Sequence, residues 1–162
     1  MPDAISNTSP LLYLHRIEAI EWLPMLFSSI WVPSAVVEEL REGQRRGFDV
    51  PQVDAYPYLQ LVDPSNTPSE WLSLDLGPGE LAAMALALEH QNHIVLLDDL
   101  LARRTAQAAG LTVWGTLKIV LEAKSQGLTA TIEPLIRQLS EKGLWLSAEI
   151  RERILVLAGE TP

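Results

Sequence analysis

The sequence of 162 residues contains no cysteine and only three histidines. Without cysteine, the chain can form neither a disulfide nor a thiolate metal site. The histidines, at positions 15, 90 and 93, are too few and too scattered to predict a zinc site, so any metal ion would be held by oxygen atoms. Long apolar runs are also missing, since none approaches the roughly 18 residues that a membrane-spanning helix needs.

The N-terminal segment MPDAISNTSP lacks the basic start and the long apolar core of a secretory signal peptide. We therefore expect a soluble, cytoplasmic protein with no membrane partner. Basic residues are outnumbered: 12 Lys and Arg face 21 Asp and Glu, for a formal net charge of -9. This balance argues against nucleic-acid binding through a broad basic face, but not against an enzyme that contacts a few phosphates locally.

Hydrophobic residues make up 48% and charged residues 20% of the chain, which is typical of a globular protein, and the length suits one domain over residues 1–162. Short apolar segments bounded by turn residues predict strands over residues 3–7, 28–33, 58–62, 93–97 and 111–115. Residues 48–70 otherwise have the composition of a loop. Apolar spacing predicts helices over residues 10–26, 34–47, 76–91, 99–110, 116–127, 132–143 and 147–159. Alternating strands and helices predict an α/β protein, a three-layer α/β/α sandwich with a mainly parallel sheet, followed by C-terminal helices from about residue 128.

Polar residues gather where the strands of this predicted sheet end, which is where ligands bind in such folds. Asn7 follows the first strand, and Asp98 and Asp99 follow the strand over 93–97. Glu39 lies early in the helix after the second strand, and Glu80 lies in the first turn of the helix that Gly-Pro-Gly introduces. Carboxylates from distant parts of a chain suit Mg²⁺ or Mn²⁺, hard cations that prefer oxygen ligands.

Each of these residues also has a structural interpretation. Asp98 or Asp99 could cap the following helix, although one cap would explain only one of the two. Glu80 could simply face the positive end of its helix dipole. Glu39 could belong to a solvated helix face, and Asn7 could form a turn.

Four segments, read in order, resemble the PIN-domain proteins: SNTSPL, VPSAVVEEL, LGPGELAAMALALE and VLLDDLLARRTAQAAGLTVWGTLKIVLEAK. The resemblance covers residues 4 to about 126 and is strongest to a poorly characterised branch with the motifs SNTSPL, GE, LLDD..AR and GT. It implies an α/β/α fold and a metal-dependent endoribonuclease that hydrolyses RNA phosphodiester bonds. Many bacterial members are toxins of toxin–antitoxin pairs, which would require an antitoxin-like protein partner.

The resemblance also implies a catalytic and metal site that uses Mg²⁺ or Mn²⁺. Its residues would be Asn7, Glu39, Glu80 and Asp98, with Asp99 as an alternative or additional ligand. Candidates for contacts to substrate or within the site are Thr8, Ser9, Arg103 and Thr116. Arg103 could instead pair with Asp99 one helical turn earlier, and Thr116 could simply cap the junction between strand and helix.

One position departs from the family pattern, because active members usually carry Asp where this chain has Asn7. An amide oxygen can still bind a metal ion or its waters, but the negative charge is lost. At an effective dielectric constant of about 20, a unit charge about 4 Å from a cation is worth about 4 kcal/mol before desolvation. The alternative to a nuclease is therefore a catalytically weakened PIN-fold binding or regulatory module.

Two further alternatives concern other features of the chain. An acidic pair after a parallel strand also occurs in phosphoryl-accepting proteins, but no Asp-x-Asp-x-Thr signature follows the first strand here. The apolar C-terminal segments IEPLIRQL and IRERILVLAG could form a homodimer or higher homo-oligomer, or they could cover the sheet.

Overall fold

The centre of the molecule is a five-stranded parallel sheet. The computed structural model describes residues 1–66 and 75–161. Its strands are β1 (Ala4–Ser6), β2 (Ile30–Val32), β3 (Leu59–Leu61), β4 (Ile94–Leu96) and β5 (Thr112–Trp114), arranged in the order β3-β2-β1-β4-β5. All four pairings between these strands are parallel. The five predicted strands are confirmed, including the edge strand within residues 58–62.

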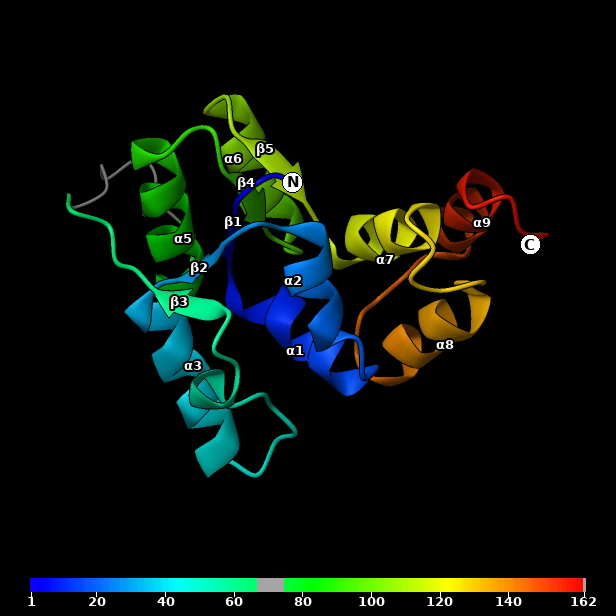
Figure 1. Ribbon diagram of the computed structural model, residues 1–162, viewed down its shortest axis with the longest axis horizontal. Coiled ribbons are helices and arrows are strands. Elements are labelled where there is room, and N and C mark those ends of the chain that lie inside the picture. Colours follow the sequence, from blue (N-terminus) through cyan, green and yellow to red (C-terminus); the bar gives the residue numbers. More distant parts are fainter. Residues whose placement is uncertain (67–74, 162) are drawn as a thin grey trace.

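Helices connect and follow these strands, as Figure 1 shows. The chain runs from β1 to β2 through α1 (Thr8–Arg16), the 3₁₀ turn η1 (Ile20–Trp22) and α2 (Leu23–Leu26). It continues from β2 to β3 through α3 (Ser34–Arg45) and the 3₁₀ turn η2 (Val53–Ala55). Before and after β4 come α5 (Pro78–Glu89) and α6 (Leu100–Ala108). After β5 come α7 (Thr116–Ser125), α8 (Glu133–Glu141) and α9 (Ala148–Leu157).

The central strands β1 and β4 are buried on both faces of the sheet, since their successive side chains point to opposite sides and all of them are buried. Ala4 and Leu96 lie in a core with apolar residues of α1, α2, α3 and the C-terminal helices. Ile5, Val95 and Leu97 lie in a second core with apolar residues of α5 and α6. The three-layer α/β/α arrangement predicted from the sequence is therefore confirmed.

The C-terminal helices extend the layer that contains α1, and Figure 1 shows them together at the right of the molecule. Ile136 and Leu139 of α8 and Leu155 of α9 are completely buried in the same core as α1. Trp145, which precedes α9, is nevertheless 80% exposed, and Val156 is 63% exposed. Of the helices described, none has the length and apolar character to span a membrane.

The prediction of one continuous helix over residues 10–26 is wrong, because α1 ends at Arg16 and the chain turns before η1. Glu18 adopts a left-handed conformation with φ of 59°. Its N–H donates to the carbonyl of His15, and the N–H of Ala19 donates to the carbonyl of Leu14, which is the Schellman pattern of a helix end. The expected loop over residues 48–70 contains η2 and β3, and its last part, residues 67–70, lies outside the described residues.

Candidate functional site

Asn7 lies at the carboxyl end of the central strand β1, where it immediately precedes α1. Its backbone N–H donates to the carbonyl oxygen of Leu96 at 3.1 Å, so Asn7 is fixed beside the end of β4. The residue is only 4% exposed, and the amide oxygen Oδ1 is buried with no hydrogen-bond partner among the described residues. Since buried polar atoms are almost always paired, this oxygen is an acceptor in need of a donor or a cation.

Glu39, on the second turn of α3, is held by two donors from other parts of the chain. The backbone N–H of Gly79 donates to Oε1 at 2.8 Å, and the hydroxyl of Thr8 donates to Oε2. Glu39 is half-buried, whereas its neighbour Glu38 is exposed and pairs with Arg41 at 3.0 Å. Only the second carboxylate of the Glu38–Glu39 pair therefore reaches α1 and α5.

Glu80 is fixed by the Gly-Pro-Gly turn that opens α5. Gly77 precedes the helix, Pro78 is its first residue, and the carboxylate of Glu80 accepts the N–H of Gly77 at 3.1 Å. This is half of the reciprocal capping arrangement that stabilises a helix start. Burial raises the pKa of Glu80, the hydrogen bond from Gly77 opposes the shift, and the negative charges of Asp99 and Glu39 add to it. The carboxylates of Asp99 and Glu39 are therefore close enough to Glu80 to disfavour its ionised form.

Asp98 is bound on both carboxylate oxygens by a single residue. The backbone N–H of Thr116 donates to Oδ1 at 2.7 Å, and the hydroxyl of Thr116 donates to Oδ2 at 2.7 Å. Burial raises the pKa of Asp98, although these hydrogen bonds and the positive charge of Arg103 act in the opposite direction. Asp98, which follows the end of β4, therefore links that strand to the start of α7.

Asp99 caps a different helix. Its Oδ2 accepts the backbone N–H of Ala102 at 3.0 Å, at the start of α6. Each member of the acidic pair therefore binds the free N–H groups of one helix, Asp98 those of α7 and Asp99 those of α6. Capping therefore accounts for both carboxylates, whereas the sequence analysis considered it as an explanation for only one of them.

The four residues expected to contact substrate or site lie in distinct environments. Thr8 binds Glu39, and Ser9 follows it in the first turn of α1. Thr116 is completely buried, so its hydroxyl faces Asp98 rather than solvent. The positive charge of Arg103 acts on Asp98, and its Nε is buried without a hydrogen-bond partner among the described residues.

The candidate ligand atoms are carboxylate and amide oxygens, which are the ligands that a hard divalent cation prefers. The unpaired amide oxygen of Asn7 supports this fit, since it lacks the partner that a buried acceptor requires. Within residues 1–66 and 75–161, however, no three acidic or histidine side chains lie close enough together to hold one ion. The carboxylates accept hydrogen bonds from backbone and hydroxyl donors, which leave a second lone pair on each oxygen for an ion.

The sequence interpretation overlooked the role of Gly79. This residue is buried in the first turn of α5 and donates its N–H to Glu39. The GE motif carried the signal. A glycine in the first turn of a helix, directly before a carboxylate of the site, indicates that another part of the chain approaches the backbone closely there.

The molecule is thus a parallel sheet between two helical layers, with Asn7 and Asp98 just after the carboxyl ends of β1 and β4. The model of the family DUF3368, a PIN domain, matches residues 3–160. The chain therefore belongs to the PIN-domain family. None of the curated proteins with which the sequence was compared matches it.

Proposed function

We propose that this PIN-domain protein is a ribonuclease that requires Mg²⁺ or Mn²⁺ and hydrolyses RNA phosphodiester bonds. The observation that carries the proposal is the buried, unpaired amide oxygen of Asn7. Its neighbour Thr8 binds Glu39, the charge of Glu39 acts on Glu80, and Asp98 follows the end of the adjacent strand β4. An oxygen of this kind is stabilised by a cation, and the surrounding carboxylates supply the negative charge that a divalent ion needs.

In this proposal the ion is held by Asn7, Glu39, Glu80 and Asp98. When bound, such an ion lowers the pKa of a bound water and stabilises charge on a phosphodiester. Thr8 and Gly79 orient Glu39 through the hydrogen bonds already described, and Thr116 orients Asp98. Asp99 contributes negative charge from the cap of α6.

RNA would approach this site through a few contacts, since the chain carries a formal net charge of -9. The positive charge of Arg103 acts on Asp98, one of the proposed ligands. A guanidinium matches the geometry of phosphate oxygens, so we assign Arg103 to the substrate phosphate. Ser9, in the same helix turn as Thr8, is a further candidate for a contact to RNA.

A second candidate function is a PIN-fold binding or regulatory module, and Asn7 is the observation that favours it. Without the charge of an aspartate, the site attracts a cation less strongly by an amount on the order of a few kcal/mol. A module of this kind could still bind RNA or a protein partner. If the protein acts as a toxin, the partner would be an antitoxin-like protein. Self-association would use the exposed apolar side chains near α9, which include Trp145 and Val156.

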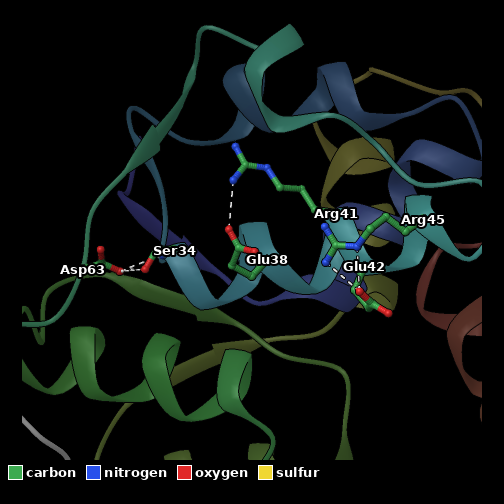
Figure 2. Close-up of polar contacts among 6 residues, drawn as sticks. All are labelled: Ser34, Glu38, Arg41, Glu42, Arg45 and Asp63. Carbon is green, nitrogen blue, oxygen red and sulfur yellow. Dashed lines mark hydrogen bonds and ion pairs between the residues drawn. The ribbon is translucent and has the colours of Figure 1, made fainter.

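Cleavage assays test the nuclease proposal directly. Single-stranded RNA and tRNA are incubated with the protein in Mn²⁺, Mg²⁺ or EDTA, beside Glu80→Gln and Glu39→Gln purified identically. Glu38→Gln is the matched control, because Glu38 neighbours Glu39 on the same helix but pairs with Arg41 on an exposed face (Figure 2). We expect metal-dependent cleavage that Glu38→Gln retains and the other two variants lose. Cleavage in EDTA, or equal cleavage by all variants, contradicts the proposal.

The variant Asn7→Asp separates the two candidate functions. Restoring the charge should tighten Mn²⁺ binding and raise the cleavage rate at least about tenfold if the site is a metal site weakened by the amide, since about 1.4 kcal/mol already corresponds to a factor of ten. A binding module would gain no cleavage from this substitution. Mn²⁺ titration and RNA cleavage by the wild type and the variant, at equal protein concentration, give the answer.

A further inference from the structure

At Gly79, more closely than at any other glycine of the chain, a carboxylate occupies the space that a side chain would fill. A Cβ atom placed on this residue would lie 2.7 Å from Oε2 and 2.8 Å from Oε1 of Glu39. Carbon and oxygen atoms that are not bonded do not approach this closely, so the carboxylate would have to leave. Its present position depends on the N–H of Gly79 and on the hydroxyl of Thr8.

We propose that Gly79 is a positioning residue: it keeps the start of α5 open for the Glu39 carboxylate and thereby sets the affinity of the proposed site for a divalent cation. This inference rests on the proposed function for its metal-binding part. Its structural part, the coupling between positions 79 and 39, follows from the contact alone.

Helix energetics give the opposite expectation for an alanine at position 79, which makes the inference testable. Gly79 has no left-handed backbone conformation and lies inside the 12-residue helix α5. Alanine is the better helix former, so a substitution that affected only the helix would raise stability. The added methyl group would meet the carboxylate of Glu39, which lies at the end of a flexible side chain. That carboxylate can turn away only by leaving the N–H of Gly79 and the hydroxyl of Thr8.

Gly77 provides a matched control two residues earlier in the same turn. A Cβ atom placed on Gly77 would lie 3.5 Å from Oε1 of Glu80, which is an ordinary van der Waals contact. Gly77→Ala therefore removes a glycine from the same motif without displacing a carboxylate.

The test is a double-mutant cycle of Gly79→Ala and Glu39→Ala, with Gly77→Ala alongside, measured by thermal unfolding without metal and by Mn²⁺ titration. We expect Gly79→Ala to lower the unfolding temperature and to weaken Mn²⁺ binding about 10- to 100-fold, the range for loss of a group that orients a metal ligand. In the Glu39→Ala background, the same substitution should no longer lower the unfolding temperature or weaken Mn²⁺ binding further. Gly77→Ala should leave Mn²⁺ affinity within about threefold of the wild type, because no ligand moves.

Two results overturn the inference. One is an equal loss of stability from Gly79→Ala in both backgrounds, which would mean that the added methyl group meets something other than Glu39. The other is unchanged Mn²⁺ affinity in a folded Gly79→Ala protein. Failure of the wild type to bind Mn²⁺ contradicts the proposed function instead, and the metal-free unfolding cycle then still decides whether Gly79 positions Glu39.

Discussion

Glu160 ties the C-terminal helices together and gives a sharp prediction about stability. Its carboxylate accepts hydrogen bonds from the ammonium of Lys124 at 2.8 Å and from the N–H groups of Ile132 at 2.8 Å and Glu133 at 3.1 Å. It therefore joins the end of α7 to the start of α8. The side chain is only 13% exposed, so water replaces these contacts poorly when they are lost.

Replacing Glu160 by alanine should cost about 3 kcal/mol of unfolding free energy, because three hydrogen bonds are removed at about 1 kcal/mol each. For a chain of this size, the midpoint of thermal unfolding should fall by roughly 6–12 °C. Glu160→Gln keeps one acceptor and loses the charge, so its loss should be smaller. Glu152→Gln, at an exposed position of α9, is the control and should leave the midpoint within about 2 °C of the wild type.

The same contact predicts a dependence on pH. Burial alone would raise the pKa of Glu160, but the hydrogen bonds from Lys124, Ile132 and Glu133 outweigh it, and the pKa lies below its ordinary value. A carboxyl group whose pKa is lowered by folding contributes its full stability above the unfolded pKa of about 4.3. That contribution is lost as the pH falls through the lower, folded pKa.

Denaturant unfolding of the wild type and Glu160→Ala between pH 7 and pH 3 measures this effect. The difference between the two proteins should be largest at pH 7 and should shrink below about pH 4.3 as the wild-type carboxylate is protonated. A difference that stayed constant over this range would show that the charge of Glu160 does not stabilise the fold. Equal stability at pH 7 would refute the assignment of Glu160 as a tie between α7 and α8.

Three further predictions follow from contacts described above. Glu18→Gly should stabilise the fold by about 1 kcal/mol in denaturant unfolding, because glycine adopts the left-handed helix end without steric cost; a loss of stability would contradict that geometry. Thr116→Val should cost about 1–2 kcal/mol and raise the pKa of Asp98 further, measured by unfolding and by NMR titration, whereas Thr116→Ser, which keeps the hydroxyl, should preserve that pKa. If the exposed residues near α9 mediate self-association, Trp145→Ser together with Val156→Ser should lower the molar mass measured by light scattering; an unchanged mass would exclude that surface.

The strands and most helices could be predicted from the sequence, because short apolar runs between turn residues mark the strands and apolar residues at helical spacing mark the helices. The break between α1 and η1 could not. Apolar residues continue at helical spacing through Ile17 and Ile20, and the residue that ends the helix is Glu18 rather than a glycine. The sequence carries no local stop signal there, so tertiary packing decides the turn.

For the candidate site, residue types and their placement at strand ends could be predicted, but the hydrogen-bond partners could not. Asp98 and Asp99 are adjacent in sequence, yet one binds Thr116 and the other Ala102. Which helix start each carboxylate reaches depends on the direction in which the chain leaves β4. The contact between Glu39 and Gly79 depends on how α3 packs against α5, and no local pattern encodes that packing.

The strand order also constrains when the molecule can assemble during its synthesis. β1 is made first, yet it occupies the middle of the sheet, and one of its two neighbours is β4. Until residues 94–96 have left the ribosome, β1 presents an open edge, and the N–H of Asn7 lacks the carbonyl of Leu96. A nascent chain therefore cannot hold the proposed site, and its unpaired strand edge is open to pairing with another chain.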